Sequence, residues 1–570
     1  FEEAVKESAP RTVMCSYNKI NGEYASENRY LLTDILRKEW GYKGCVVSDW
    51  GAVNNRVKGL QAGLDLEMPY SGGYNDRQIV KAVQEGRLDE AVLDEAVERV
   101  LNVVFAGEEQ HRPEDISDKE TDHKKAADIE TECAVLLENN GILPLNTDRK
   151  VAYIGEFAEK PRYQGGGSSH INPFRVVSAL DAAGEKGRSV TYAKGFSNEN
   201  DSMTEQELEK ALRTAAEADV AVIFAGLPEI FESEGYDRTS MKLPKCQDRL
   251  IEEVLKVQPN VVVVLHNGSP VELPWADRVS AILEMYLGGQ GVGEACDRLL
   301  FGEANPSGRL AETFPYRLED NPSFLHFPGN GKRVLYGEDI FVGYRYYDTK
   351  KVPVRYAFGH GLSYTEFTYG DLTLSSAQMT DEDILTVSLK VKNSGKTEGK
   401  EVVQLYVADL CGISERPVKE LKGFAKVHLL PGEEKTVSME ISARNLSYYE
   451  ERLGDWYAPS GTYRILIGHA SDDIRLHADI VFKTKKKLPL RVDFTTTFGE
   501  LLDHTKTAPV ITELLAPLAA AAASAEGMSD EYKKLGEQVI REMPLKSLLG
   551  QMPGEQVEQL IGQLNCLLAQ

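Results

Sequence analysis

The segment Lys43-Gly44-Cys45-Val46-Val47-Ser48-Asp49-Trp50-Gly51-Ala52 decides the fold of the N-terminal part of this chain. Its short, nearly continuous run of small and apolar residues is typical of a strand buried on both faces of a parallel sheet. Enzymes built on parallel sheets place their chemistry at the carboxyl ends of the strands, where Asp49 and Trp50 stand. Asp49 is therefore a candidate catalytic carboxylate. Spacing alone favours equally a second role, in which Asp49 is the N-cap of the following helix.

Residues 1–107 repeat this alternation of strand and helix. The expected elements are a strand at 11–18, a helix at 28–40, the Asp49 strand, a strand at 62–69, and helices at 76–85 and 89–105. Strand, helix and strand at this pitch form the βα unit of a parallel sheet. Three units do not close a (β/α)8 barrel, so we expect a further segment or a second chain to supply the strands that precede Phe1.

A charged, apolar-poor linker is expected at 108–125, followed by an α/β sandwich domain at 126–370. The predicted strands are 151–154, 220–225, 261–266 and 281–286, and the predicted helices are 126–139, 205–218 and 248–256. Alternating strands and helices favour a layered α/β architecture.

Near residue 370 the hydrophobic period changes to two. Short alternating strands separated by turn residues predict a fibronectin type III-like β-sandwich at 371–485. A helical extension at 486–570 follows, with helices expected at 516–523, 530–541 and 555–568. We expect this extension to serve docking or homo-oligomerisation.

Charge, hydropathy and cysteine content exclude several classes of protein. The formal net charge of −24 argues against a nucleic-acid partner. No apolar run is long enough to predict a membrane span. The seven cysteines are scattered and never paired as Cys-x-x-Cys, which favours reduced thiols in a cytoplasmic protein over disulfides or a zinc site.

Several ordered motifs resemble those of glycoside hydrolase family 3, and in particular its multi-domain β-glucosidases. They are the Asp49 segment, Val13-Met14-Cys15-Ser16-Tyr17-Asn18, Asp65-Leu66-Glu67-Met68-Pro69, the segment from Arg162 to Pro173, the segment from Glu232 to Arg238, Tyr286-Leu287-Gly288-Gly289-Gln290-Gly291, and Phe358-Gly359-His360-Gly361-Leu362-Ser363-Tyr364. The resemblance covers residues 1 to about 480 and leaves out the tail. It implies three domains in this order: part of a (β/α)8 barrel, an α/β sandwich and a fibronectin-like module. The implied fold class is therefore multi-domain, α/β plus all-β.

The resemblance implies a retaining mechanism with Asp49 as the nucleophile, because this aspartate matches the family's catalytic position. Tyr17 matches a tyrosine that orients the nucleophile. Met14 and Trp50 are expected substrate contacts, with the indole offering an apolar face to a sugar ring. Core packing is the alternative for Trp50.

The general acid must come from another part of the chain. On chemistry alone both Glu232 and Glu234 qualify, and the resemblance selects Glu234, the glutamate that precedes a glycine. Ser168 matches a serine that contacts the sugar. The Gly165–Gly167 run lacks the spacing of a nucleotide-binding loop. Asp237 and Arg238 are expected to form a structural ion pair.

These expectations combine into a retaining, exo-acting β-glucosidase that removes terminal β-D-glucose from small oligosaccharides or glycosides. It would need no metal and no cofactor. One alternative is a β-xylosidase or another exo-glycosidase of the same family. An alternative from a different class is a non-catalytic carbohydrate-binding protein.

Overall fold

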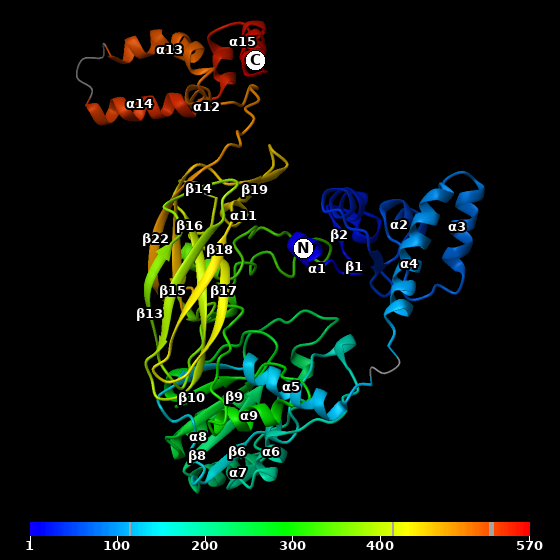
Figure 1. Cartoon of the computed structure of the whole chain (residues 1–570), viewed down its shortest axis with the longest axis vertical. Helices are drawn as coiled ribbons and strands as arrows, with labels where there is room; N and C mark the ends of the chain where they lie inside the picture. Colours follow the sequence, from blue (N-terminus) through cyan, green and yellow to red (C-terminus); the bar gives the residue numbers. More distant parts are fainter. Residues whose placement is uncertain (113–115, 413–414, 524–528, 570) are drawn as a thin grey trace. The chain divides into compact units, whose positions relative to one another are not determined.

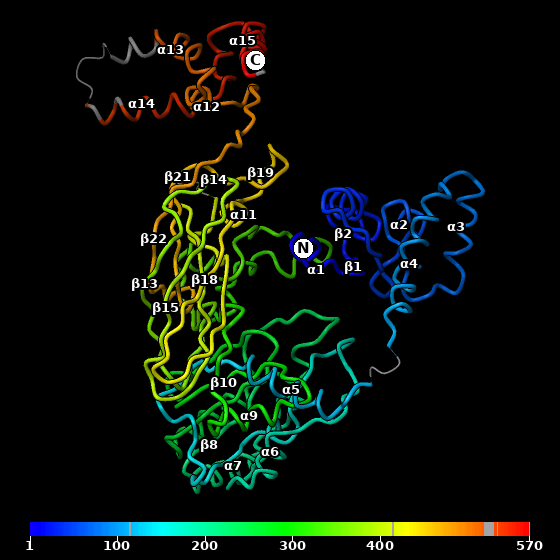
Figure 2. The backbone as a smooth tube through the Cα atoms, in the orientation of Figure 1, coloured from blue at the N-terminus to red at the C-terminus, as the bar shows by residue number. Residues whose placement is uncertain are grey.

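The computed structural model describes residues 1–112, 116–412, 415–523 and 529–569 (Figure 1). The chain divides into two compact units, Phe1–Asp118 and Lys119–Gln570, and each is described by itself. Figure 2 traces the backbone in chain order, from the blue N-terminal unit through the α/β sheet and the yellow β-sandwich to the orange and red helices of the tail.

The first unit is built on two parallel strands, β1 (Thr12–Cys15) and β4 (Cys45–Ser48), which pair in the register Cys15↔Ser48. The other elements are α1 (Glu2–Ser8), β2 (Lys19–Ile20), β3 (Glu23–Tyr24), η1 (Ala25–Glu27), the π-helix η2 (Tyr30–Glu39), α2 (Arg56–Ala62), α3 (Tyr74–Gln84) and α4 (Glu90–Gln110). Val46 and Leu64 are fully buried in the core of this unit. The predicted buried strand and its neighbour are confirmed.

The predicted strand at 62–69 is wrong over most of its length. Ala62 ends helix α2, and Gly63 caps it with a positive φ of 109°. Only Leu66 forms a β-bridge, to Val47. Asp65 instead fixes this segment with its buried carboxylate, which accepts a hydrogen bond from the Val46 N–H and pairs with Arg37 and Arg99.

The second unit begins with an α/β domain around a six-stranded sheet in the order β5-β10-β9-β8-β6-β7. Its strands are β5 (Val135–Asn139), β6 (Val151–Ile154), β7 (Val190–Ala193), β8 (Val220–Gly226), β9 (Val261–His266) and β10 (Ala281–Glu284). Strand β5 is antiparallel to β10, and the other pairs are parallel. Every residue of β8 and β9 is buried, as expected for central strands covered on both faces.

The remaining described elements of this domain are six α-helices, two short strands and five short 3-10 helices. They are α5 (Lys119–Cys133), α6 (Ala179–Glu185), α7 (Glu205–Ala216), α8 (Lys245–Val257), α9 (Val292–Leu300), α10 (Tyr344–Lys350), β11 (Phe314–Pro315), β12 (Val354–Tyr356) and the short helices η3 (Glu156–Ala158), η4 (Gly167–Ser169), η5 (Glu229–Phe231), η6 (Ala276–Arg278) and η7 (Leu318–Asp320).

The predicted helix at 126–139 is wrong in its second half, where the run from Val135 to Leu137 is a fully buried strand. A short apolar run at the end of a helix does not distinguish a further turn from a buried strand. The expected linker at 108–125 is also shorter than predicted, since α4 continues to Gln110 and α5 begins at Lys119.

The β-sandwich consists of the sheets β13-β15-β18 and β14-β22-β21-β16-β17. Its strands are β13 (Phe367–Leu374), β14 (Gln378–Thr380), β15 (Leu385–Asn393), β16 (Gly399–Asp409), β17 (Glu420–Leu429), β18 (Glu434–Ile441), β21 (Gly461–Gly468) and β22 (Ile474–Lys483), with α11 (Ala443–Leu446) and the hairpin β19 (Tyr448–Glu450) and β20 (Asp455–Tyr457). In β15 buried residues alternate with less buried ones, which matches the predicted period of two.

The C-terminal segment contains α12 (Phe498–Asp503), α13 (Ala508–Ala523), α14 (Asp530–Glu542), η8 (Leu545–Gly550) and α15 (Gly554–Ala569). The three predicted helices are confirmed, and α12 was not expected. Phe498, Leu501, Ile511 and Leu564 contribute to a hydrophobic core of its own. Among the described helices of the whole chain, none combines the length and the apolar character needed to cross a membrane.

Candidate active site

Asp49 directly follows β4, and its backbone N–H continues the parallel ladder by donating to the Cys15 carbonyl at 3.0 Å. One carboxylate oxygen of Asp49 accepts hydrogen bonds from the Tyr17 hydroxyl at 2.9 Å and from the Trp50 N–H at 2.7 Å. These two donors fix the direction of the carboxylate, and a nucleophile needs such a fixed direction. The structure thus brings Tyr17 to Asp49.

The capping alternative for Asp49 is wrong, because another residue caps the next helix. Asn55 is the N-cap of α2, and its side chain accepts a hydrogen bond from the Lys58 N–H at 3.0 Å. The Asp49 carboxylate is therefore not used as a helix cap and is available to a substrate.

Large side chains of the first unit near this carboxylate are exposed. Met14 of β1 and Trp50 are each 56% exposed, and Tyr17 is 50% exposed. The core-packing alternative for Trp50 is not supported in this unit, because its indole is more than half exposed. Exposed apolar groups next to a polar group are typical of a binding surface.

The second predicted carboxylate, Glu234, lies in the loop after β8 and η5 of the second unit. One of its oxygens accepts the Ser168 N–H at 2.6 Å and also the Ser168 hydroxyl. A Cβ at Gly167 would lie 2.6 Å from this same oxygen, and a Cβ at Gly166 would clash with Ser233. The glycine run therefore allows two loops to touch, which joins Ser168 to Glu234.

Glu232 has a different environment. Its carboxylate accepts hydrogen bonds from Arg162 at 2.7 Å, from the Gly268 N–H at 2.8 Å and from the Ser269 hydroxyl. Burial raises the pKa of Glu232, but these donors and the Arg162 charge outweigh it and lower the pKa below the usual range. A carboxylate held ionised is a poor proton donor, so this geometry favours Glu234 as the acid.

The expected Asp237–Arg238 ion pair is wrong. The Arg238 guanidinium instead donates to the Ser269 hydroxyl at 2.6 Å and lies 3.8 Å from the Glu232 carboxylate. Arg238 thus belongs to the same group of contacts as Glu232.

Buried polar groups support these loops at the carboxyl ends of β9 and β10. The Asn267 amide donates to the Glu284 carboxyl at 2.9 Å and to the Ser269 carbonyl at 3.0 Å. Burial raises the pKa of Glu284 well above its usual value. Burial and the nearby Arg162 charge lower the pKa of His266 to about 4, so the imidazole is neutral at pH 7. Sequence reasoning missed Arg162, Ser269 and Asn267, whose roles depend on contacts between distant loops.

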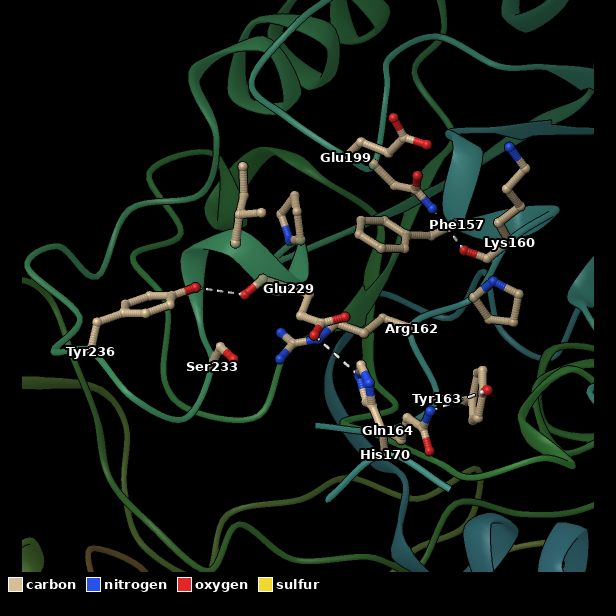
Figure 3. A pocket seen from close by; sticks show the side chains of 14 residues that line it. Phe157, Lys160, Arg162, Tyr163, Gln164, His170, Glu199, Glu229, Ser233 and Tyr236 are labelled. Carbon is tan, nitrogen blue, oxygen red and sulfur yellow. Dashed lines mark hydrogen bonds and ion pairs between the residues drawn. The ribbon is translucent and has the colours of Figure 1, made fainter. Parts of the chain in front are cut away.

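A cavity of about 640 Å³ opens beside these loops (Figure 3). His170 pairs with Glu229 across it at 3.1 Å, as the dashed line shows, and the Tyr236 hydroxyl donates to the Glu229 carbonyl at 3.0 Å. Gln164 and Ser233 also line the cavity. It lies next to the loop that carries Glu234, because Ser233 precedes that residue.

Among the described residues, no group of three or more His, Cys, Asp or Glu side chains has the arrangement to hold a metal ion. Asp65 and Glu67 bind protein groups instead. Asp65 pairs with arginines, and Glu67 accepts a hydrogen bond from the Asn75 amide at 2.5 Å.

Comparisons with known families match three parts of the chain. Residues 1–103 match the glycosyl hydrolase family 3 N terminal domain, and residues 134–364 match the glycosyl hydrolase family 3 C-terminal domain. Residues 401–471 match a fibronectin type III-like domain.

Individual relatives match nearly the whole chain. Thermostable beta-glucosidase B of Acetivibrio thermocellus is 48% identical over 99% of this chain and 76% of its own length. An exo-alpha-(1->6)-L-arabinopyranosidase of Bifidobacterium breve is 40% identical over 100% of this chain and 74% of its own length. The crystal structure of the GH3 beta-glucosidase of Bifidobacterium adolescentis superimposes with a TM-score of 0.84 and 40% identity, covering 90% of this chain and 75% of that one.

These matches correct one expectation. The resemblance was predicted to end before the C-terminal helices, yet the two relatives that cover 99% and 100% of this chain include that segment. The helices are therefore shared with relatives. On these matches, the chain belongs to glycoside hydrolase family 3.

Proposed function

We propose that this protein is a retaining, exo-acting β-glucosidase, with Asp49 as the nucleophile and Glu234 as the general acid and base. The observation that carries this proposal is the Asp49 carboxylate at the end of β4, held by the Tyr17 hydroxyl and the Trp50 N–H. The 48% identity to a protein named as a thermostable beta-glucosidase supports the choice of substrate.

The reaction proceeds in two displacements. Asp49 attacks the anomeric carbon while Glu234 protonates the departing glycosidic oxygen, which leaves a covalent glucosyl-enzyme. Glu234, now ionised, then removes a proton from water, whose oxygen attacks the same carbon and releases Asp49. Ser168, Met14, Tyr17 and Trp50 are proposed to contact the sugar or to orient these two carboxylates.

The test uses 4-nitrophenyl β-D-glucoside as substrate. Proton NMR of early product is expected to show β-glucose first, because two displacements retain the configuration. Initial formation of α-glucose, or full activity of Asp49→Ala, would contradict the proposal.

A second candidate is an exo-glycosidase for a pentopyranose. It is favoured by the match of a named arabinopyranosidase to the whole of this chain at 40% identity. Comparing kcat/KM on the 4-nitrophenyl glycosides of β-D-glucose, β-D-xylose and α-L-arabinopyranose separates the two. A preference for either pentoside by tenfold or more, about 1.4 kcal/mol, would replace the first proposal.

Further parts of the proposal concern organisation. We propose domain boundaries between residues 110 and 119 and near residues 370 and 485, and a role of the C-terminal helices in homo-oligomerisation. The seven cysteines are free in this structure, which supports a proposed reducing, cytoplasmic location.

A further inference from the structure

A second cavity, of about 600 Å³, lies between the loops that follow β8 and β9 and the segment 312–347. None of the described residues that line it also lines the cavity in Figure 3. Small-molecule sites in proteins have volumes of about 300–1,000 Å³. The second cavity is therefore large enough for a ligand of its own, and the proposed hydrolysis uses none of the side chains that line it.

Acidic groups outnumber basic groups in the lining of this second cavity. Asp237, Glu312 and Glu338 contribute carboxyl groups, and Arg238 is the one Lys, Arg or His among the described lining residues. The Arg238 charge already has a partner outside the cavity, because its guanidinium lies 3.8 Å from the Glu232 carboxylate. The lining therefore favours a ligand with a positive charge.

Two of these carboxyl groups lack a hydrogen-bond donor. Within the described part of the chain, no group donates to the side chain of Glu312 or of Glu338, and one oxygen of Glu338 is completely buried. Burial and the charge of Glu232 raise the pKa of Glu312 to about 7. Buried carboxyl groups ordinarily have a donor or a cation as partner. A ligand with a charged N–H group would supply this missing partner.

Aromatic rings form the apolar part of the wall. Phe324 and Phe327 are 42% and 48% exposed, so a ligand can reach their rings, whereas the Tyr347 side chain is buried. An apolar ligand body would gain free energy by packing against these rings, at about 25 cal/mol for each Å² of apolar surface removed from water. Ring faces also attract a cation that lies within about 6 Å. The wall thus suits an aromatic body with a cationic end.

Hydrogen bonds hold two segments of the wall in place. The Asn321 side chain accepts the Ser323 N–H at 3.0 Å and the Ser323 hydroxyl at 2.8 Å. The Ser323 carbonyl accepts the Phe327 N–H at 2.8 Å, and the Glu338 carbonyl accepts the Phe341 N–H at 2.9 Å. A cavity whose wall is already ordered loses less conformational entropy when a ligand enters.

We propose that this second cavity is a binding site for a small aromatic ammonium compound. The ammonium group binds the carboxylates of Glu312 and Glu338, and the ring of the ligand packs against Phe324 and Phe327. An aromatic carboxylate would meet three carboxyl groups of the lining and a single guanidinium. An uncharged alcohol of the same shape would keep the ring contacts and lose the ion pairs.

The test compares three probes that share a phenyl ring and differ in the charge of the other end. Ligand-observed NMR titrations of the whole chain at pH 8 measure the Kd of 2-phenylethylammonium, 2-phenylethanol and phenylacetate. The ammonium compound is expected to bind at least tenfold tighter than the alcohol, a difference of about 1.4 kcal/mol, and phenylacetate is expected to bind most weakly. Equal Kd values for the ammonium compound and the alcohol, tighter binding of phenylacetate, or no binding of the ammonium compound would overturn the proposal.

Variants locate the bound ammonium compound. Glu312→Gln and Glu338→Gln keep the size of each side chain and remove its charge, and each is expected to raise the Kd about tenfold. The matched control is Glu319→Gln, at an exposed position of η7 outside the lining. Asp49→Ala tests whether the probe occupies the proposed catalytic site instead. Both Glu319→Gln and Asp49→Ala are expected to keep the wild-type Kd within about twofold.

The outcomes separate this site from the proposed function, because no glucoside is present in the titrations. A raised Kd in either cavity variant, with both controls unchanged, supports the site whether or not the protein hydrolyses glucosides. A wild-type Kd in both cavity variants, or a Kd raised only in Asp49→Ala, overturns it. Circular dichroism checks that the variants fold. Should one of them fail to fold, the other variant and the comparison of the three probes on the wild-type protein decide the matter.

Discussion

Ser168 donates two hydrogen bonds to a single carboxylate oxygen of Glu234, one from its N–H at 2.6 Å and one from its hydroxyl. The two residues are 66 positions apart in sequence. The loops meet because Gly166 and Gly167 leave room for Ser233 and Glu234 of the second loop. The proposed acid and base is thus positioned by a residue that was expected to contact only the sugar.

Replacing Ser168 by alanine removes the hydroxyl donor and keeps the N–H donor. A hydrogen bond to a charged group is worth about 1.5–3 kcal/mol, so kcat for 4-nitrophenyl β-D-glucoside is expected to fall about 10- to 100-fold. Steady-state kinetics check this, with Ser169→Ala, at the next position of η4, as the control. An equal loss in both variants would point to a general disturbance of the loop.

Tyr17→Phe tests the corresponding contact of the nucleophile. The change removes the hydroxyl that donates to Asp49 at 2.9 Å and keeps the ring. We expect kcat/KM to fall about 10- to 100-fold, and Asp49→Ala to lower it about 10⁴-fold or more. Tyr30→Phe, on an exposed tyrosine of the same unit, is the control. Wild-type rates for Tyr17→Phe would remove Tyr17 from the proposed mechanism.

Azide separates the roles of Glu234 and Glu232. Loss of a general acid and base costs about 10²–10⁴-fold, and Glu234→Ala is expected to lose the least with a dinitrophenyl leaving group that needs no protonation. Azide attacks the glucosyl-enzyme without a base, so it is expected to restore turnover and to form β-glucosyl azide, which NMR detects.

Glu232→Ala is also expected to lose activity, for another reason. Its carboxylate joins Arg162, Gly268 and Ser269, so the variant loosens the loop that carries Glu234. Azide is not expected to restore a misplaced loop. Rescue of Glu232→Ala and not of Glu234→Ala would exchange the two assignments.

The sequence was most informative where function and local structure coincide. Asp49 and Tyr17 each follow a strand of one parallel pair, so the strand pattern alone placed them at the same edge. Arg162 and Glu232 are 70 residues apart in two irregular loops, and no periodicity predicts such a contact. The apolar run Val135–Leu137 has no periodicity that separates strand from helix, and only its pairing with β10 makes it a strand.

Glu312 provides a pH-dependent test of the α/β domain. Burial, together with the charge of Glu232, raises the pKa of Glu312 from 4.5 to about 7. Between these values the folded protein keeps a proton that the unfolded chain releases, so the free energy of unfolding falls as the pH rises through this window. Glu312→Gln carries no titrating proton and is expected to melt higher than the wild type at pH 8 and to show less change between pH 5 and pH 8.

Thermal melts at the two pH values check this prediction. Glu319→Gln, at an exposed position of η7, is the control and is expected to keep the wild-type pH dependence. A Glu312→Gln melting temperature that falls with pH as steeply as that of the wild type would assign the effect to other groups.

Loss of the Glu401 side chain is expected to destabilise the second unit. Its fully buried carboxylate receives the Arg309 guanidinium at 3.0 and 3.1 Å, His469 at 3.0 Å and the Tyr369 hydroxyl at 3.0 Å. Burial raises the pKa of Glu401, but the His469 hydrogen bond and the Arg309 charge lower it below its usual value. The stabilising effect is therefore present at neutral pH and is lost as the pH falls through that lowered pKa.

Glu401→Ala leaves the Arg309 guanidinium buried without its carboxylate partner, which costs about 3–5 kcal/mol for pairs of this kind. The control is Glu398→Ala, which removes an exposed partner of His428 at 3.5 Å and is expected to cost less than about 1 kcal/mol. Because a multi-domain chain need not unfold in one step, the measurement is the midpoint of each resolved urea transition, followed by fluorescence and circular dichroism. Arg309 comes from the α/β domain and Glu401 from the β-sandwich, so both transitions are expected to move in Glu401→Ala. A shift no larger than that of Glu398→Ala would show that the network does not couple the two.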